Sequence, residues 1–86
     1  MKVISISEEC HGFIGLAKDF ESTKKFLLEH GWIDECLEIS KDNKWHYIDE
    51  VLGSDWRAKV MNMTMEEFEE IFEGSFLLDT IEVYGT

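Results

Sequence analysis

The sequence predicts an α+β domain whose small, mainly antiparallel sheet has helices packed on one face. Segments of alternating apolar residues open and close the chain, and segments with apolar residues at helical spacing lie between them. The strands come in neighbouring pairs, in the order ββα-ββ-αα-β, rather than in strict alternation with helices, which favours α+β. The length predicts one domain that spans residues 1–86.

The chain begins with a predicted β-hairpin. Residues 2–7 alternate between apolar and polar side chains, residues 8–12 form a polar turn that ends in glycine, and residues 12–18 return as the second strand. Gly15 within that strand indicates a bulge or a close approach by a neighbouring backbone.

A helix is predicted next. Asp19 or Ser22 can cap its first turn, and Gly31 can end it. The side chains that share one broad face of this helix are Phe20, Thr23, Phe26, Leu27 and His30, widened by Leu28, with Lys24 and Lys25 outside.

The middle of the chain predicts a second hairpin. Residues 36–40 alternate, residues 41–44 have turn composition, and residues 45–48 form the returning strand. Cys36 is expected to be a small core residue. One of Trp45 and His46 must point outward on a two-stranded hairpin, and Trp45 is the candidate for an exposed aromatic anchor.

Two short helical segments and a last strand are also predicted. Residues 49–52 form a helical turn closed by Gly53, and Ser54 caps a helix whose buried positions are Trp56, Val60 and Met63. Residues 76–84 form the last strand. Because apolar residues lie on both of its faces, the last strand is expected to be central or well covered.

The most strongly predicted helix, residues 64–74, is also the most charged segment. Thr64 and Glu67 have the spacing of a capping box. Met65, Phe68, Ile71 and Phe72 form an apolar stripe, and Glu66, Glu69, Glu70 and Glu73 form an acidic stripe without a Lys or Arg within a turn. The acidic stripe is either a solvated outer face or a docking face for a basic partner.

The chain is strongly acidic, with a formal net charge of −11 at pH 7. Such a charge disfavours direct contact with nucleic acid or an anionic membrane and permits attraction to a basic protein surface. The 44% of hydrophobic residues argues against disorder. The seven acidic residues that follow Val60, with no Lys or Arg among them, are Glu66, Glu67, Glu69, Glu70, Glu73, Asp79 and Glu82.

The chemistry-bearing residues predict no catalytic set, no cofactor and no metal site. Cys10 and Cys36 match no zinc-binding spacing, and Cys10 beside His11 lacks an evident third group to orient the histidine. The first residues predict a strand rather than a signal peptide, and no segment is long enough to span a membrane. Cytoplasmic residence with free thiols is therefore expected.

Two stretches carry a resemblance. One is Glu-Glu-Cys-His-Gly-Phe-Ile-Gly-Leu-Ala-Lys-Asp with a later Gly-Trp-Ile; the other is Leu-Gly-Ser-Asp-Trp-Arg followed by Thr-Met-Glu-Glu-Phe-Glu-Glu-Ile-Phe-Glu. In these the chain resembles small uncharacterised acidic proteins encoded by phages and prophages of Gram-positive bacteria. The resemblance implies an accessory protein of a mobile element. Such proteins often modulate host proteins, and some small acidic ones mimic the charge of nucleic acid.

Three functional hypotheses follow. The leading one is a non-enzymatic interaction protein that binds a basic, nucleic-acid-binding protein surface, with Trp45 or Tyr84 as apolar anchor. The alternative is a structural module that forms a homodimer through a strand edge or an aromatic patch. The third is an enzyme or metal protein that uses Cys10, His11 or a carboxylate pair. The partner-binding residues of the leading hypothesis are Glu66, Glu67, Glu69, Glu70, Glu73, Asp79, Glu82 and Trp45.

Overall fold

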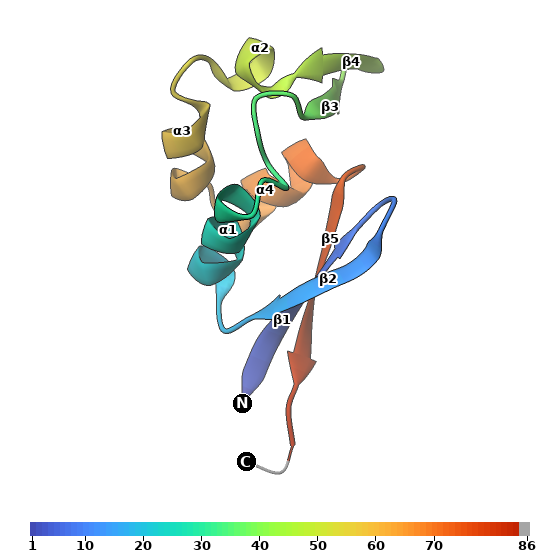
Figure 1. Cartoon of the computed structure of the whole chain (residues 1–86), viewed down its shortest axis with the longest axis vertical. Helices are drawn as coiled ribbons and strands as arrows, with labels where there is room; N and C mark the ends of the chain where they lie inside the picture. The colour runs from blue at the N-terminus through green and yellow to red at the C-terminus, as the bar shows by residue number, and fades with distance from the viewer. Residues whose placement is uncertain (85–86) are drawn as a thin grey trace.

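The computed structural model describes residues 1–84, which fold into an elongated α+β unit with extents of 45 × 24 × 22 Å. Figure 1 shows the helices and a short hairpin in the upper part and a long three-stranded sheet in the lower part. The elements are β1 (Lys2–Glu8), β2 (Gly12–Ala17), α1 (Phe20–Glu29), β3 (Glu38–Lys41), β4 (Lys44–Tyr47), α2 (Ile48–Leu52), α3 (Trp56–Asn62), α4 (Met65–Phe72) and β5 (Phe76–Glu82).

The larger sheet is antiparallel, and its strand order is β2-β1-β5. Ile4 of β1 lies opposite Ala17 of β2 and Thr80 of β5, so the first strand is the central one. The expectation that the last strand is central or well covered is therefore wrong. β5 lies at an edge, and within residues 1–84 the outer face that carries Leu77 and Ile81 stays exposed.

The pairing of β1 with β2 contains the predicted bulge. Gly15 lies opposite Ile6 and Phe13 lies opposite Ser7, so Ile14 is the extra residue. A Cβ atom on Gly15 would lie 3.0 Å from the ring of Phe26, which shows that a side chain of α1, rather than a neighbouring backbone, needs the space.

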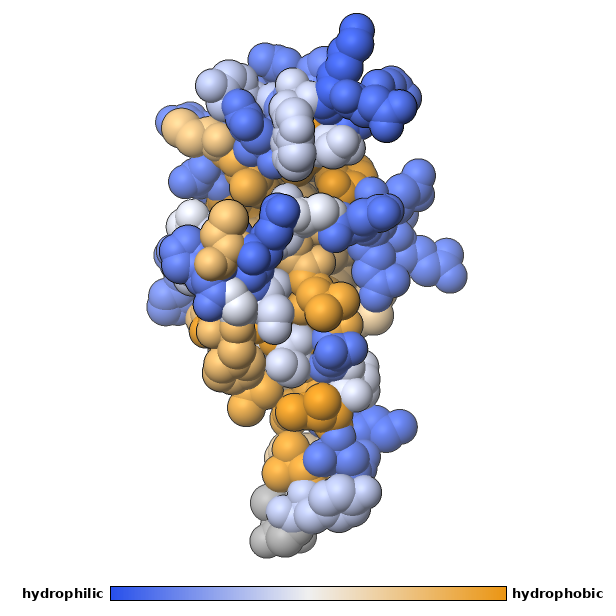
Figure 2. Space-filling view, turned by 90° about the vertical axis from the view of Figure 1, so that its right-hand side faces the viewer, coloured by the Kyte–Doolittle hydropathy of each residue, from blue (hydrophilic) through white to orange (hydrophobic). Residues whose placement is uncertain are grey.

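The helices cover one face of this sheet and form the core with it. Ile4 and Ile6 of β1 point into the core, and Phe68 and Phe72 of α4 are fully buried there. Their rings contact each other with centroids 4.6 Å apart, and Phe20 of α1 meets Phe68 edge-on. Within residues 1–84 no helix packs on the opposite face of the sheet (Figure 1). Figure 2 shows apolar side chains in the lower half of the molecule, where the sheet lies.

The strands belong to two sheets rather than one. β3 and β4 form a separate two-stranded hairpin at the other end of the molecule (Figure 1). Asp42 and Asn43 both have positive φ, which is the geometry of the tight hairpin turn predicted there. β3 begins at Glu38, two residues later than expected, and this leaves Cys36 exposed; the core assignment of Cys36 was wrong.

Lys24 also contradicts the sequence prediction, because its side chain is 1% exposed instead of lying outside α1. Its ammonium group donates to the carbonyl oxygens of Met61 (2.6 Å) and Met63 (3.0 Å), just where α3 ends and leaves carbonyls without partners. It also pairs with Glu21 at 2.7 Å and lies over the ring of Phe20. Lys24 therefore ties α1 to the α3–α4 junction.

The helix caps agree in part with expectation. Asp19 caps α1 by accepting a hydrogen bond from the amide of Ser22 (2.7 Å), and Thr64 and Glu67 form the capping box of α4. Asp55, not Ser54, occupies the N-cap position of α3. Among residues 1–84, no helix has both the length and the apolar character needed to cross a membrane.

Candidate functional site

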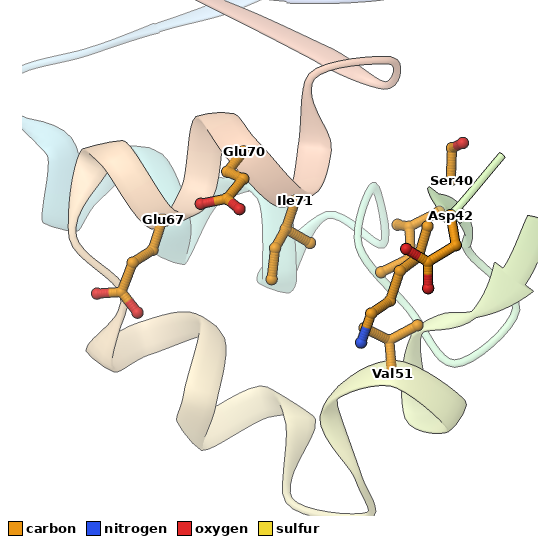
Figure 3. A pocket seen from close by; sticks show the side chains of 8 residues that line it. Ser40, Asp42, Val51, Glu67, Glu70 and Ile71 are labelled. Atoms are coloured by element: carbon orange, nitrogen blue, oxygen red, sulfur yellow. The ribbon is translucent and has the colours of Figure 1, made fainter.

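A groove separates helix α4 from the β3–β4 hairpin. It consists of two adjoining hollows of about 470 Å³ and 490 Å³. Both are lined by Ser40 and Asp42 from the hairpin and by Glu70 and Ile71 from α4. Figure 3 shows Glu67, Glu70 and Ile71 on one side of the first hollow, with Ser40, Asp42 and Val51 across from them. We call this feature the α4–hairpin groove.

Apolar side chains line part of the groove. Ile39 of β3 is buried, while Val51 of α2 and Ile71 of α4 are half-buried and partly open to the groove. Trp45 of β4 lines the second hollow and is 61% exposed. A large aromatic side chain at the border of a groove can bury much area when a partner covers it. The groove therefore offers an apolar floor with an aromatic anchor.

Acidic residues dominate the charge around this floor. Both hollows together are lined by five acidic residues and one basic residue, namely Glu9, Asp42, Glu67, Glu70, Glu73 and Lys41. No ion pair in the described part of the chain involves Glu70 or Glu73. A cleft lined by one sign of charge concentrates its potential and attracts groups of the opposite sign.

The local sequence explains why these carboxylates face the groove. Phe68 and Phe72 fix the inner side of α4 in the core, so positions 67, 70 and 71, one turn apart, turn toward the hairpin. The carboxylate of Glu67 is already engaged, because it accepts hydrogen bonds from the amide (3.2 Å) and hydroxyl (3.0 Å) of Thr64. Glu70 and Glu73 are thus the carboxylates of this stripe that line the groove without being engaged in a cap.

The structure brings together half of the predicted partner-binding residues. Trp45, Glu67, Glu70 and Glu73 line the α4–hairpin groove. Glu66 and Glu69 are exposed on α4 but do not line either hollow. Asp79 lies in register with Ser5 on the uncovered face of the sheet, and Glu82 pairs with the N-terminal amine at 3.3 Å.

Sequence reasoning missed several residues of the groove. The sequence pattern places Asp42 in a turn and Ile71 in an apolar stripe, and neither position by itself indicates a groove. Glu9 reaches the second hollow from the β1–β2 turn. A signal was present for Ile71, because it follows Phe68 by three positions and so lies at the edge of the buried stripe. No sequence pattern indicates that the β1–β2 turn, the β3–β4 hairpin and α4 meet at this groove.

The β1–β2 turn holds the chemistry-bearing pair Cys10 and His11. Nδ1 of His11 lies 2.5 Å from a carboxylate oxygen of Glu8, which also accepts hydrogen bonds from the amides of Cys10 and His11. The hydrogen bond from His11 is the largest of the causes that lower the pKa of Glu8. His11 thus stabilises the β1–β2 turn. Among residues 1–84, no group of three or more His, Cys, Asp or Glu side chains is arranged to hold a metal ion.

Comparison with known proteins gives no assignment, since no family model, no curated protein and no solved structure matches this chain.

Proposed function

We propose that this chain is a non-enzymatic interaction protein that binds a basic protein segment in the α4–hairpin groove. The observation that carries the proposal is the combination of an apolar floor, an exposed Trp45 and free carboxylates at Glu70 and Glu73 in one groove. Neither the carboxylates nor the apolar side chains alone would indicate a binding site, because charge runs are often solvated and single exposed aromatics are common on protein surfaces.

The carboxylates and the apolar floor with Trp45 would contribute to binding in different ways. Lysine or arginine side chains of the partner would lie over Glu70 and Glu73, which speeds encounter and selects a basic sequence. Apolar side chains of the partner would cover Ile71, Val51 and the ring of Trp45, which supplies most of the affinity. The partner is therefore a segment that alternates basic and apolar residues, rather than a purely polybasic tail.

Basic segments of this kind occur on proteins that bind nucleic acid. In its strong form the proposal is that the acidic groove competes with nucleic acid for such a surface. The resemblance to proteins of phages and prophages adds that the partner belongs to the bacterial host.

Two synthetic peptides of equal charge test the proposal. One alternates Lys and Leu, and the other alternates Lys and Gly. Titration of the wild-type chain at about 0.05 M and 0.5 M salt should show binding that weakens with salt for both peptides, because added salt shortens the screening length. The Lys-Leu peptide should bind at least about tenfold more tightly, since its leucines cover the apolar floor.

The control is the Trp45→Ala variant, which removes the anchor without changing the charge. It should reduce the affinity for the Lys-Leu peptide and leave the affinity for the Lys-Gly peptide unchanged. Equal affinities for the two peptides, or equal losses for both in Trp45→Ala, would show that the groove attracts charge without binding a partner.

A further inference from the structure

The uncovered face of the three-stranded sheet has an apolar surface that the groove does not use. β2 contributes Phe13 and Leu16, which are 63% and 55% exposed, and β5 contributes Leu77 and Ile81, which are 62% and 40% exposed. Together they expose on the order of 400 Å² of apolar surface, which is comparable to the largest apolar patch of a typical monomer, a surface that is often functional.

The register arranges these side chains as two ridges and a trough. Ser7 of β1 lies between Phe13 and Leu77, and Ser5 lies between Leu16 and Asp79. Residues directly opposite each other in an antiparallel sheet share a face. Because serine is short, the central strand forms a low row between two high ones, and Ser7 and Leu77 also line a hollow of about 450 Å³ at one end.

The charge of this face differs from that of the chain as a whole. Asp79 is the charged side chain among the described strand residues that share this face. These residues lie within the ranges 3–7, 13–16 and 77–81. The whole chain has 19 acidic and 8 basic residues. The centres of protein interfaces are depleted of charge in this way. A basic partner is therefore not selected by this face.

We propose that a second copy of this chain covers the β1–β2 part of the face and forms a two-fold dimer. With the axis parallel to the strands and between β1 and β2, the ridge of Phe13 and Leu16 from each copy lies in the serine trough of the other. Phe13 then comes over the partner's Ser7, beside the hollow at the partner's Leu77, and Leu16 comes over the partner's Ser5. Each contact occurs twice, as an isologous interface requires.

This arrangement leaves β5 at the rim of the interface, so that Asp79 stays in contact with water and Leu77 and Ile81 are covered only in part. The surface of the single chain also fits an unpartnered face. Its accessible surface of 5816 Å² exceeds the roughly 5,300 Å² typical of a monomer of this mass. Its radius of gyration of 13.2 Å exceeds the roughly 12 Å of a compact domain of this length.

The contact between the two copies is small. Two short strands bury less than the roughly 800 Å² per partner of a standard interface, which is the size range of weak, transient contacts, so we expect a dimer that depends on concentration. Two copies each carry a net charge of −11, and Glu9 and Glu73 lie beside the hollow. Salt screens this repulsion and should strengthen the dimer, whereas it weakens binding of a basic segment.

Sedimentation equilibrium of the wild-type chain at rising concentration, in about 0.05 M and 0.5 M salt, tests this inference. We expect the average mass to rise from one protomer toward two, and to rise at lower concentration in high salt. A mass that stays at one protomer up to the millimolar range in high salt would overturn the proposal.

A matched pair of variants identifies the surface. Leu16→Glu places a charge on the ridge and should weaken the association at least about tenfold. Tyr84→Glu places the same charge on a side chain that is 86% exposed and lies beyond β5, and it should leave the association unchanged. Circular dichroism confirms that both variants fold. Association that survives Leu16→Glu, or that Tyr84→Glu abolishes as well, would contradict the arrangement.

Discussion

The two sides of helix α4 differ in environment, because one side is buried in the core and the other faces the α4–hairpin groove. On the inner side Phe68 and Phe72 are fully buried, and the ring of Phe76 lies 6.0 Å from that of Phe72. On the side toward the hairpin, Glu70 and Glu73 face an open groove and belong to no ion pair in the described chain. The residues that stabilise the core and those proposed to bind a partner thus lie on separate sides of one helix, and we expect that each set can be changed without affecting the other.

A substitution on the inner side of α4 should have the largest effect on the free energy of unfolding. Phe68→Ala removes a ring that is fully buried against Phe20 and Phe72, and we expect a loss of about 3–5 kcal/mol in the free energy of unfolding. For a domain whose total stability is on the order of 5–15 kcal/mol, this brings it close to unfolding. Urea denaturation followed by circular dichroism measures the loss. A loss below about 1 kcal/mol would mean that α4 is not anchored by this ring.

The junction beside α4 should show the next largest effect. Lys24→Met keeps most of the side-chain volume but removes the donors to the carbonyl oxygens of Met61 and Met63, so we expect a loss of about 2–3 kcal/mol. The same change at the exposed Lys25 is the control and should cost less than about 0.5 kcal/mol. Equal losses at both positions would remove the structural role assigned to Lys24.

The smallest effect concerns carboxylates that serve turns and caps instead of a groove. His11 lowers the pKa of Glu8 below its ordinary value of 4.5, and hydrogen bonds from Ser22 lower that of Asp19 below 3.8. A lowered pKa contributes stability above the unfolded-state pKa and loses it as pH falls through the folded-state value. Glu8→Gln and Asp19→Asn should therefore reduce stability near neutral pH and match the wild type in acid. Denaturation curves at several pH values measure this, and a constant difference at every pH would contradict the assignment.

Local signals predicted much of the fold. The capping box of Thr64 and Glu67, the turn over residues 41–44 and the bulge next to Gly15 each depend on neighbouring residues, and each is present. Contacts between distant segments were not predictable. Lys24 is polar and was placed outside, because nothing in its helix indicates the carbonyls of Met61 and Met63.

The edge position of β5 shows the same limit. Apolar residues on both faces of β5 indicate that something packs on each face. The pattern of side chains cannot distinguish a covering segment of the same chain from another molecule. For the candidate site, the acidic stripe of α4 is visible in the sequence, but which of its members line the groove depends on where the hairpin packs.

The most direct test compares two pairs of carboxylates from the acidic stripe of α4. The groove variant, Glu70→Gln with Glu73→Gln, changes the two that line a hollow, and the exposed variant, Glu66→Gln with Glu69→Gln, changes two that line neither hollow. Each removes two negative charges and one member of both i,i+4 repulsive pairs, so their effects on the helix itself are within a few tenths of a kcal/mol. The measurement is the dissociation constant of the Lys-Leu peptide at about 0.05 M salt. We predict that the groove variant binds at least about tenfold more weakly than the wild type while the exposed variant changes by less than about threefold. Equal weakening by both would mean that net charge alone attracts the peptide, and it would contradict the assignment of the α4–hairpin groove as the binding site.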